Sequence, residues 1–302
     1  MQKFANRSIQ QQEVNIYFQS QSSYWKEIYT SNGVYAEIHR NRYMRVLEWV
    51  DSLALAPGSK VLEIGCGAGY MAIALTQCGF QVRAIDSAEA MVGLASQHAV
   101  EAGVADQLSV GIGDVHALAF EDGSFDLVLA IGVIPWIERA EPAIQEMARV
   151  TKPGGHVILT ADNRARLTNY LDLWQLPALR PLKRRLKILL EQAKLRYRSP
   201  DDIDAALHKC RFIDEALAHF ELLKVRSMTL GFGPFSLFRH SILPEKHSIA
   251  LHYRLQSLAE HNVPVFRSTG AQYLVLARKS AAPSLVQSVR FENPGFNASV
   301  TR

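Results

Sequence analysis

The sequence predicts an α/β protein with a doubly wound, mainly parallel sheet, and three observations predict it. Residues 61–64 form a short apolar segment typical of a buried strand, with glycines at positions 65, 67 and 69 directly after it and a predicted helix at 70–78. Acidic residues, Asp86 and Asp114, stand at the ends of two later predicted strands. The predicted strands alternate with helices and lie near residues 61–64, 81–86, 108–112, 125–131 and 155–161. This order is typical of a sheet whose ligand lies beyond the carboxyl ends of the strands.

The glycine-rich turn predicts a nucleotide-type ligand. Gly65, Gly67 and Gly69 have no side chains, so a ligand can lie against backbone amides at the start of the next helix. The spacing also fits a dinucleotide site, because Asp86 stands where a ribose-binding acid is expected. Glu63 favours a different ligand, since a buried carboxylate repels phosphate and attracts an ammonium or sulfonium group. S-adenosylmethionine carries both cations and no phosphate, so the sequence favours it over NAD.

The next segments agree with this ligand. Asp86 can accept hydrogen bonds from both ribose hydroxyls, and Ser87 is placed to cap the helix after it. Met91 is expected to lie against an adenine face. Asp114 can accept from the adenine amino group while the backbone of Val115 donates to the ring. Helix capping or turn formation is the simpler role for either aspartate alone.

Four segments together resemble the ordered motifs of class I S-adenosylmethionine-dependent methyltransferases: VLEIGCGAG (61–69), AIDSAEAM (84–91), GDVHALAFEDGSFDLVLA (113–130) and RVTKPGGHVILT (149–160). The resemblance is to the branch with ubiquinone, menaquinone and small-molecule methyltransferases. It implies a Rossmann-like, seven-stranded sheet with an antiparallel last strand, using further predicted strands near 221–231 and 272–278. All these motifs serve the methyl donor, so the resemblance does not identify the acceptor.

The resemblance also implies roles for individual residues. Glu63, Gly65, Gly67 and Gly69 are expected to hold the methionine end of the donor, Asp86 and Met91 the ribose and adenine, and Asp114 and Val115 the adenine edge. The backbone at Ile131 is expected to line the same pocket. Cys66 is read as a small residue tolerated beside the ligand, in preference to a reactive thiol.

Composition limits the remaining possibilities. A chain of 302 residues with 48% hydrophobic content can bury a large core. We find no apolar run long enough to span a bilayer and no signal-peptide pattern. The three cysteines lack the spacing of metal ligands, so we expect no metal and a reducing, cytoplasmic location.

We expect five regions along the chain: a helical lid (1–54) whose first 15 residues are frayed, a donor-binding core (55–162), a basic helical cap (163–212), the C-terminal part of the sheet with an insertion (213–280), and a disordered tail (281–302). In the resembled family a leading segment of this kind closes over the donor. Tyr24 and Trp25 are the candidate lid contacts, although they can equally serve only to pin the first helix to the domain.

The cap region is strongly basic. Residues 164–198 hold ten Lys or Arg against two acidic residues, and leucines at helical spacing predict a basic amphipathic helix over 181–195. Three interpretations remain open: a solvated face, peripheral contact of residues 180–198 with an anionic membrane, and nucleic-acid binding. Nucleic acid is the least favoured, because few aromatic residues stand among the charges.

The acceptor side is less defined. Trp136, Asp162 and Asn163 are expected to face the acceptor, and His39, His116 and His240 are possible bases, none of which the sequence selects. A second insertion contains three phenylalanines that either line an acceptor pocket or, as we favour, pack as core: Phe232, Phe235 and Phe238.

The sequence therefore predicts a methyltransferase that uses S-adenosylmethionine and acts on a small or lipid-like acceptor, through oxygen, nitrogen or carbon. The segment 131–136 lacks the Asn/Asp-Pro-Pro-aromatic motif of adenine and glutamine methyltransferases, which disfavours those activities. Two alternatives remain: an NAD(P)-dependent oxidoreductase and a non-catalytic donor-binding module.

Overall fold

A computed structural model describes residues 9–171, 185, 205–237 and 240–281. The strands are β1 (Lys60–Ile64), β2 (Gln81–Asp86), β3 (Leu108–Ile112), β4 (Phe125–Ala130), β5 (Thr151–Asp162), β6 (Leu222–Leu230), β7 (Ser236–Leu237), β8 (His240–Ser241) and β9 (Gln272–Lys279). The helices are α1 (Ile9–Ser20), α2 (Ser22–Glu27), α3 (Val34–Ser52), α4 (Tyr70–Gln77), α5 (Glu89–Glu101), the 3-10 turn η1 (Ile134–Trp136), α6 (Ala140–Val150), α7 (Thr168–Leu171), α9 (Cys210–His219), α10 (Glu245–Glu260) and α11 (Phe266–Thr269).

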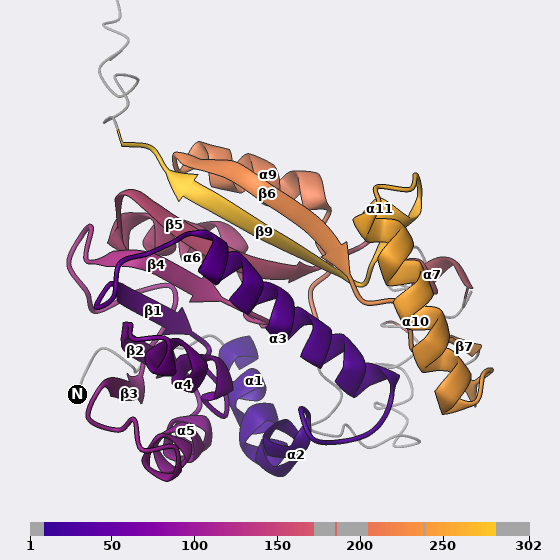
Figure 1. Cartoon of the computed structure of the whole chain (residues 1–302), viewed down its shortest axis with the longest axis horizontal. Coiled ribbons are helices and arrows are strands. Elements are labelled where there is room, and N and C mark those ends of the chain that lie inside the picture. Colours follow the sequence, from indigo (N-terminus) through magenta and orange to yellow (C-terminus); the bar gives the residue numbers. More distant parts are fainter. Residues whose placement is uncertain (1–8, 172–184, 186–204, 238–239, 282–302) are drawn as a thin grey trace, which may run out of the picture.

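A seven-stranded sheet in the order β3-β2-β1-β4-β5-β9-β6 forms the centre of the molecule (Figure 1). Strands β1 to β5 are parallel, and β9 is antiparallel to both of its neighbours, β5 and β6. The predicted Rossmann-like fold class is confirmed, including the antiparallel last strand.

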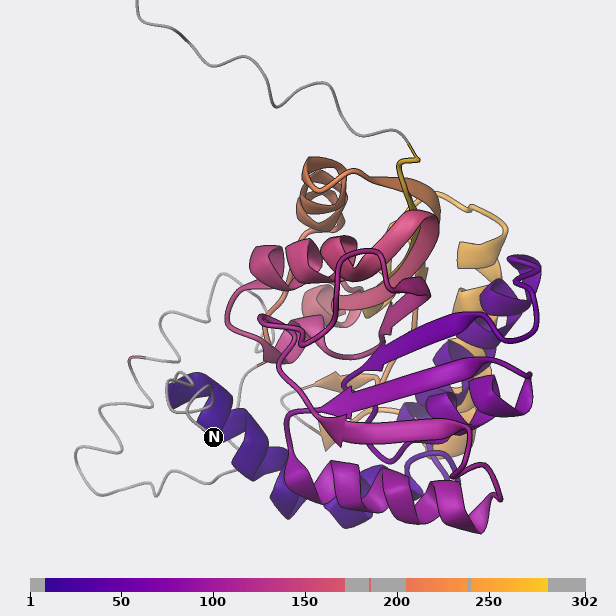
Figure 2. The same cartoon turned by 90° about the vertical axis from the view of Figure 1, so that its left-hand side faces the viewer.

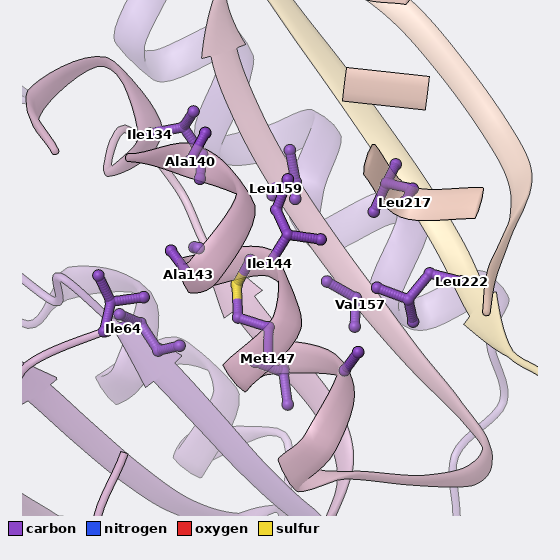
Figure 3. Close-up of a cluster of buried hydrophobic side chains, with 14 of the residues drawn as sticks. Ile64, Ile134, Ala140, Ala143, Ile144, Met147, Val157, Leu159, Leu217 and Leu222 are labelled. Atoms are coloured by element: carbon purple, nitrogen blue, oxygen red, sulfur yellow. The ribbon is translucent and has the colours of Figure 1, made fainter. Parts of the chain in front are cut away.

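Helices cover both faces of the sheet (Figure 2). Side chains alternate along each strand, so Val61 and Leu127 face one layer, built by α3, α4 and α5, while Leu62 and Val128 face the other, built by α6 and α9. On the second face, Ile144 and Met147 of α6 pack towards the strand residues (Figure 3). Apolar packing on both faces fixes the strand register and thus the positions of the strand ends.

Two local differences from the sequence expectation have clear causes. β5 begins at Thr151, four residues before the predicted strand. The segment Pro153-Gly154-Gly155, whose composition is typical of a turn, instead lies within the strand as a register irregularity: Phe125 pairs with Thr151 but Leu127 pairs with His156. Gly154 takes a positive φ of 78° there. Helix α1 begins at Ile9 within the segment expected to be frayed, and its Val14 is buried.

The expected regions map only in part onto these elements. The lid region contains α1 to α3, and the limit placed at residue 212 falls inside α9. The predicted basic helix, apart from Arg185, lies outside the described residues, as do Phe238 and residues 282–302. Phe232 and Phe235 are buried and pack with α10, in agreement with the core role that we favoured from the sequence. No described helix is long and apolar enough to cross a membrane.

Candidate functional site

A cavity lies at the carboxyl ends of the parallel strands. Glu63 of β1, Asp86 of β2, Ile131 after β4 and Asp162 of β5 line it. Gln272 lies at the same edge, because it opens the antiparallel strand β9 and pairs with Asp162. The opposite wall comes from α1, α2 and α3, whose lining residues include Gln11, Val14, Phe18, Trp25, Tyr35, His39, Arg42 and Tyr43. The packing that fixes the sheet therefore brings residues from both ends of the chain to one site.

The glycine turn forms the floor of the cavity. The backbone amides of Gly65 and Cys66 both donate to the carbonyl of Ile85, at 2.7 and 3.1 Å, and so tie the turn to β2. A Cβ on Gly65, whose φ is 67°, would lie 2.5 Å from a methyl carbon of Val133. A Cβ on Gly67, whose φ is 53°, would meet nothing within 4 Å. Glycine at 65 therefore permits close packing, and glycine at 67 keeps the cavity open.

Glu63 is a buried carboxyl without a full set of partners. Its side chain is 3% exposed, and Oε2 has no hydrogen-bond partner in the described part of the chain. Burial, and then the nearby charge of Asp86, raise the pKa of Glu63 to about 8. A bound cation would compensate the ionised carboxylate and reverse this shift.

Asp86 is held by backbone amides. Its Oδ2 accepts from the amide of Gly67 at 3.0 Å and its Oδ1 from the amide of Ala88 at 2.9 Å. Burial nevertheless raises the pKa of this carboxyl, against the lowering effect of those bonds. Each carboxylate oxygen can accept more than one hydrogen bond, so hydroxyl groups can still be bound. Next to it, Ser87 Oγ donates to Asn15 Oδ1 at 2.8 Å and so connects α1 to the site.

Arg42 is a second buried charge in the cavity, and sequence analysis missed it. The side chain is 6% exposed, and its one hydrogen bond among the described residues runs from Nη1 to Oε1 of Gln272 at 3.3 Å. Its Nε is buried without a partner, and none of the ion pairs found in the described ranges includes it. A signal was present in the sequence, since Arg42 falls between Ile38 and Val46 on the apolar stripe of its helix.

Glu63 and Arg42 form ions of opposite sign, neither has an ion-pair partner among the described residues, and both line one cavity. A buried charge without a partner is costly, so each is expected to be compensated by a ligand. The amino-acid end of S-adenosylmethionine carries an ammonium and a carboxylate on the same carbon atom. Glu63 and Arg42 fit these two groups, and Asp86 fits the ribose hydroxyls.

Aromatic rings line one side of the cavity. Trp136 of η1 stacks on Tyr17 with ring centroids 5.6 Å apart and meets Phe18 edge-on at 5.4 Å. Trp25 of α2 contacts Phe18 at 5.7 Å and His39 at 5.8 Å. The N-terminal helices are thus joined to the strand ends by a continuous aromatic contact.

The structure brings most of the predicted site residues together. Those that line the cavity are Glu63, Gly65, Cys66, Gly67, Asp86, Ser87, Met91, Ile131, Trp25, Trp136 and Asp162. Burial raises the pKa of the Cys66 thiol, which fits a packed residue better than a reactive one. His39 also lines the cavity, whereas the side chain of His240 lies outside the described set.

Five predicted residues lie outside the cavity lining. Asn163 is 1% exposed and its amide donates to the carbonyls of Ser268 and Gly270, so it joins chain segments outside the cavity lining. Gly69 begins α4, where an added Cβ would lie 2.9 Å from Ala95. The others are Asp114, which bonds His116, Val115, which is buried in the α6 core, and Tyr24, which packs on Trp25.

Comparison with known proteins agrees with this geometry. Residues 62–159 match a family described as a methyltransferase domain. The ubiquinone biosynthesis O-methyltransferase of Cupriavidus pinatubonensis is 32% identical over 133 residues, which are 44% of this chain and 53% of the relative. The enzyme of the same name from Paracidovorax citrulli is 38% identical over 119 residues, 39% of this chain and 50% of the relative. The chain thus spans about half the length of the curated relatives it matches.

Solved structures extend the likeness of fold over most of the chain. Magnesium protoporphyrin IX methyltransferase from Synechocystis PCC 6803, with bound S-adenosylhomocysteine, aligns with a TM-score of 0.59 at 20% identity, covering 90% of this chain and all of that one. A putative sarcosine dimethylglycine methyltransferase from Galdieria sulphuraria aligns with a TM-score of 0.55 at 17% identity, covering 87% and 99%. These likenesses extend the shared fold beyond the donor-binding motifs.

Proposed function

We propose that this chain, whose residues 62–159 match a methyltransferase domain, is a class I S-adenosylmethionine-dependent methyltransferase that transfers a methyl group to a small or lipid-like acceptor. The observation that carries the proposal is a pair of buried ionisable side chains of opposite sign, Glu63 and Arg42, which have no ion-pair partner among the described residues and line one cavity at the strand ends. A zwitterionic amino-acid group compensates both charges, whereas a pyrophosphate would meet the repulsion of Glu63 and Asp86.

Four of the cavity residues bind the donor in this proposal. Glu63 binds the donor ammonium, Arg42 the donor carboxylate and Asp86 the ribose hydroxyls, while Met91 lies against the adenine. When bound, the donor supplies a methyl group made electrophilic by a sulfonium. The protein then has to align the acceptor atom with the C–S bond and exclude water. Helices α1 to α3 exclude water by walling the cavity, which supports the lid role expected of residues 1–54.

The acceptor class is supported by the wall opposite the donor. Trp25, Trp136 and Phe18 give that wall an aromatic surface suited to a flat or apolar compound. The relatives named for ubiquinone biosynthesis and magnesium protoporphyrin IX are consistent with such acceptors.

We expect S-adenosylmethionine and S-adenosylhomocysteine to bind in calorimetry and NADH not to bind. With methyl-labelled donor and an extract of the native cell, label is expected in a low-molecular-weight aqueous or lipid fraction. Binding of NADH without the sulfonium donor would support the NAD(P)-dependent oxidoreductase instead. Tight donor binding with no label in any fraction would support a non-catalytic module.

We also propose a cytoplasmic location, supported by three cysteines that are all free thiols. Peripheral contact of residues 180–198 with anionic membranes is supported by the ten basic residues of segment 164–198. Wild-type protein is expected to float with vesicles that contain phosphatidylserine and to remain behind with neutral vesicles. Changing Lys183, Arg184, Arg185 and Lys187 to Glu is expected to abolish flotation while donor binding stays unchanged. Equal flotation of the variant would contradict membrane contact through this segment.

A further inference from the structure

His39 on α3 is a buried titratable side chain in the cavity wall for which donor binding provides no role. Its imidazole is 3% exposed and lines the cavity. Nδ1 lies 2.9 Å from the backbone carbonyl of Tyr35. A carbonyl can only accept, so Nδ1 carries the hydrogen, and Nε2 presents a bare lone pair.

No described residue hydrogen-bonds this Nε2. The indole of Trp25 lies against the same ring, with centroids 5.8 Å apart at an interplanar angle of 61°. Its Nε1–H is buried and has no partner in the described ranges. Two neighbouring rings in the cavity wall therefore hold one unpartnered hydrogen-bond acceptor and one unpartnered donor among the described residues.

A hydroxyl group satisfies both at once, because it donates one hydrogen bond and accepts another. The ring centroids lie 5.8 Å apart and both residues line the cavity, so both groups belong to the same part of its wall. An amine that is ready to attack cannot do the same, since its lone pair is committed to the methyl group and it has no second lone pair for the indole.

We propose that the acceptor of this enzyme is a hydroxyl oxygen, held between Nε2 of His39 and the indole N–H of Trp25, with His39 as the catalytic base. The inference rests on the proposed methyl transfer and specifies its acceptor atom. The hydroxyl O–H bond breaks and the proton moves to Nε2. The oxygen lone pair forms the new C–O bond, and the C–S bond breaks with its electron pair moving to sulfur. The products are a methyl ether, the neutral thioether and an imidazolium that returns its proton to water.

The neighbours of His39 fit this role. Burial, and then the charge of Arg42 one helical turn away, lower the pKa of His39 to about 3, so in the ligand-free protein the imidazole is neutral and a weak base. When the donor carboxylate pairs with Arg42, one of those two causes is removed and His39 becomes a stronger base. Donor binding thereby prepares the base before the acceptor reacts.

The test uses the labelled product from the native extract, so the acceptor need not be known beforehand. We expect the label to resist mild alkali and to be released as methyl iodide by hot hydriodic acid, as an ether requires. Label on carbon or nitrogen, or a methyl ester opened by alkali, would overturn the proposal. Absence of any labelled product, by contrast, would count against methyl transfer itself.

Variants assign the roles on that same product. His39→Gln is expected to lower the rate of label transfer by about 10²- to 10⁴-fold, with donor affinity changed less than twofold. Added imidazole should restore part of the rate in His39→Ala. Trp25→Phe, which keeps a ring but loses the N–H, is expected to raise the acceptor KM about 10-fold. The exposed His261, changed to Gln, is the matched control. A His39→Gln enzyme with more than a third of the wild-type rate would refute the role of His39.

A readout independent of turnover is the tautomer of His39. Nitrogen NMR of the S-adenosylhomocysteine complex, with the signal assigned by its loss in His39→Gln, should show a protonated Nδ1 and a bare Nε2 at neutral pH. A protonated Nε2 would exclude proton abstraction by this residue.

Discussion

Arg42→Met is expected to weaken S-adenosylmethionine binding by about 100-fold, equivalent to roughly 3 kcal/mol, without destabilising the ligand-free protein. Arg42 is 6% exposed, and its Nε has no partner among the described residues. Without ligand, this charge costs free energy of folding, and a methionine of similar length fills the space without that cost. With ligand, the same charge pairs with the donor carboxylate.

Calorimetry and thermal unfolding measure the two halves of this prediction. Arg45→Met is the matched control, because Arg45 lies one turn further along α3 and pairs with Glu48 and Glu260 outside the cavity. It is expected to retain wild-type donor affinity. Undiminished affinity in Arg42→Met would show that Arg42 does not bind the donor. A large loss of stability in the ligand-free variant would show that the buried Arg42 charge is already stabilised by the protein without the donor.

Arg42 also illustrates what the sequence could and could not predict. Local patterns predicted the sheet, because apolar strands, glycine turns and amphipathic helices can each be recognised from a short contiguous stretch of sequence. The donor site was predicted where it follows one strand end, as at Glu63 and Asp86. Arg42 and Gln272 meet at 3.3 Å from positions 230 residues apart, and no local pattern indicates such a contact.

Asn163 shows the opposite limit. Its position at the tip of β5 favoured an acceptor contact. In the structure, its side-chain amide instead donates hydrogen bonds to the carbonyls of Ser268 and Gly270, in the chain that connects α11 to β9. That loop follows an insertion whose path the sequence does not define. Similarly, Asp114 follows β3, an edge strand, and bonds His116 there without lining the cavity.

The affinity for S-adenosylmethionine is expected to rise with pH from about 5 to about 8, and Glu63→Gln is expected to remove this rise. Burial and Asp86 raise the pKa of Glu63 to about 8, so below that pH the ligand-free carboxyl holds a proton. The donor ammonium needs the ionised form, so binding expels the proton and affinity gains up to about tenfold per pH unit. Near pH 8 the α-amino group of the donor begins to lose its own proton, which ends the rise.

The sign for stability is the reverse. A carboxyl whose pKa is raised on folding stabilises the folded protein only while it is protonated. The ligand-free protein should therefore lose stability as pH rises from the unfolded pKa of about 4.5 to about 8, by at most roughly 1.4 kcal/mol per pH unit. Glu63→Gln should be more stable than wild type at pH 8 and bind the donor more weakly there. Glu121→Gln, an exposed substitution, should follow wild type in both measurements.

Proton counting separates this mechanism from a general effect of pH. Calorimetric titration at pH 7 in two buffers with different ionisation enthalpies should show nearly one proton released per donor bound by wild type, and almost none by Glu63→Gln. Because Asp86 is also buried and also has a raised pKa, release that persists unchanged in Glu63→Gln would assign the titration to Asp86. Proton release that falls to near zero in Glu63→Gln identifies Glu63 as the carboxyl that ionises when the donor ammonium binds. The same buried carboxyl then lowers the stability of the ligand-free protein at high pH and binds the positive charge of the donor.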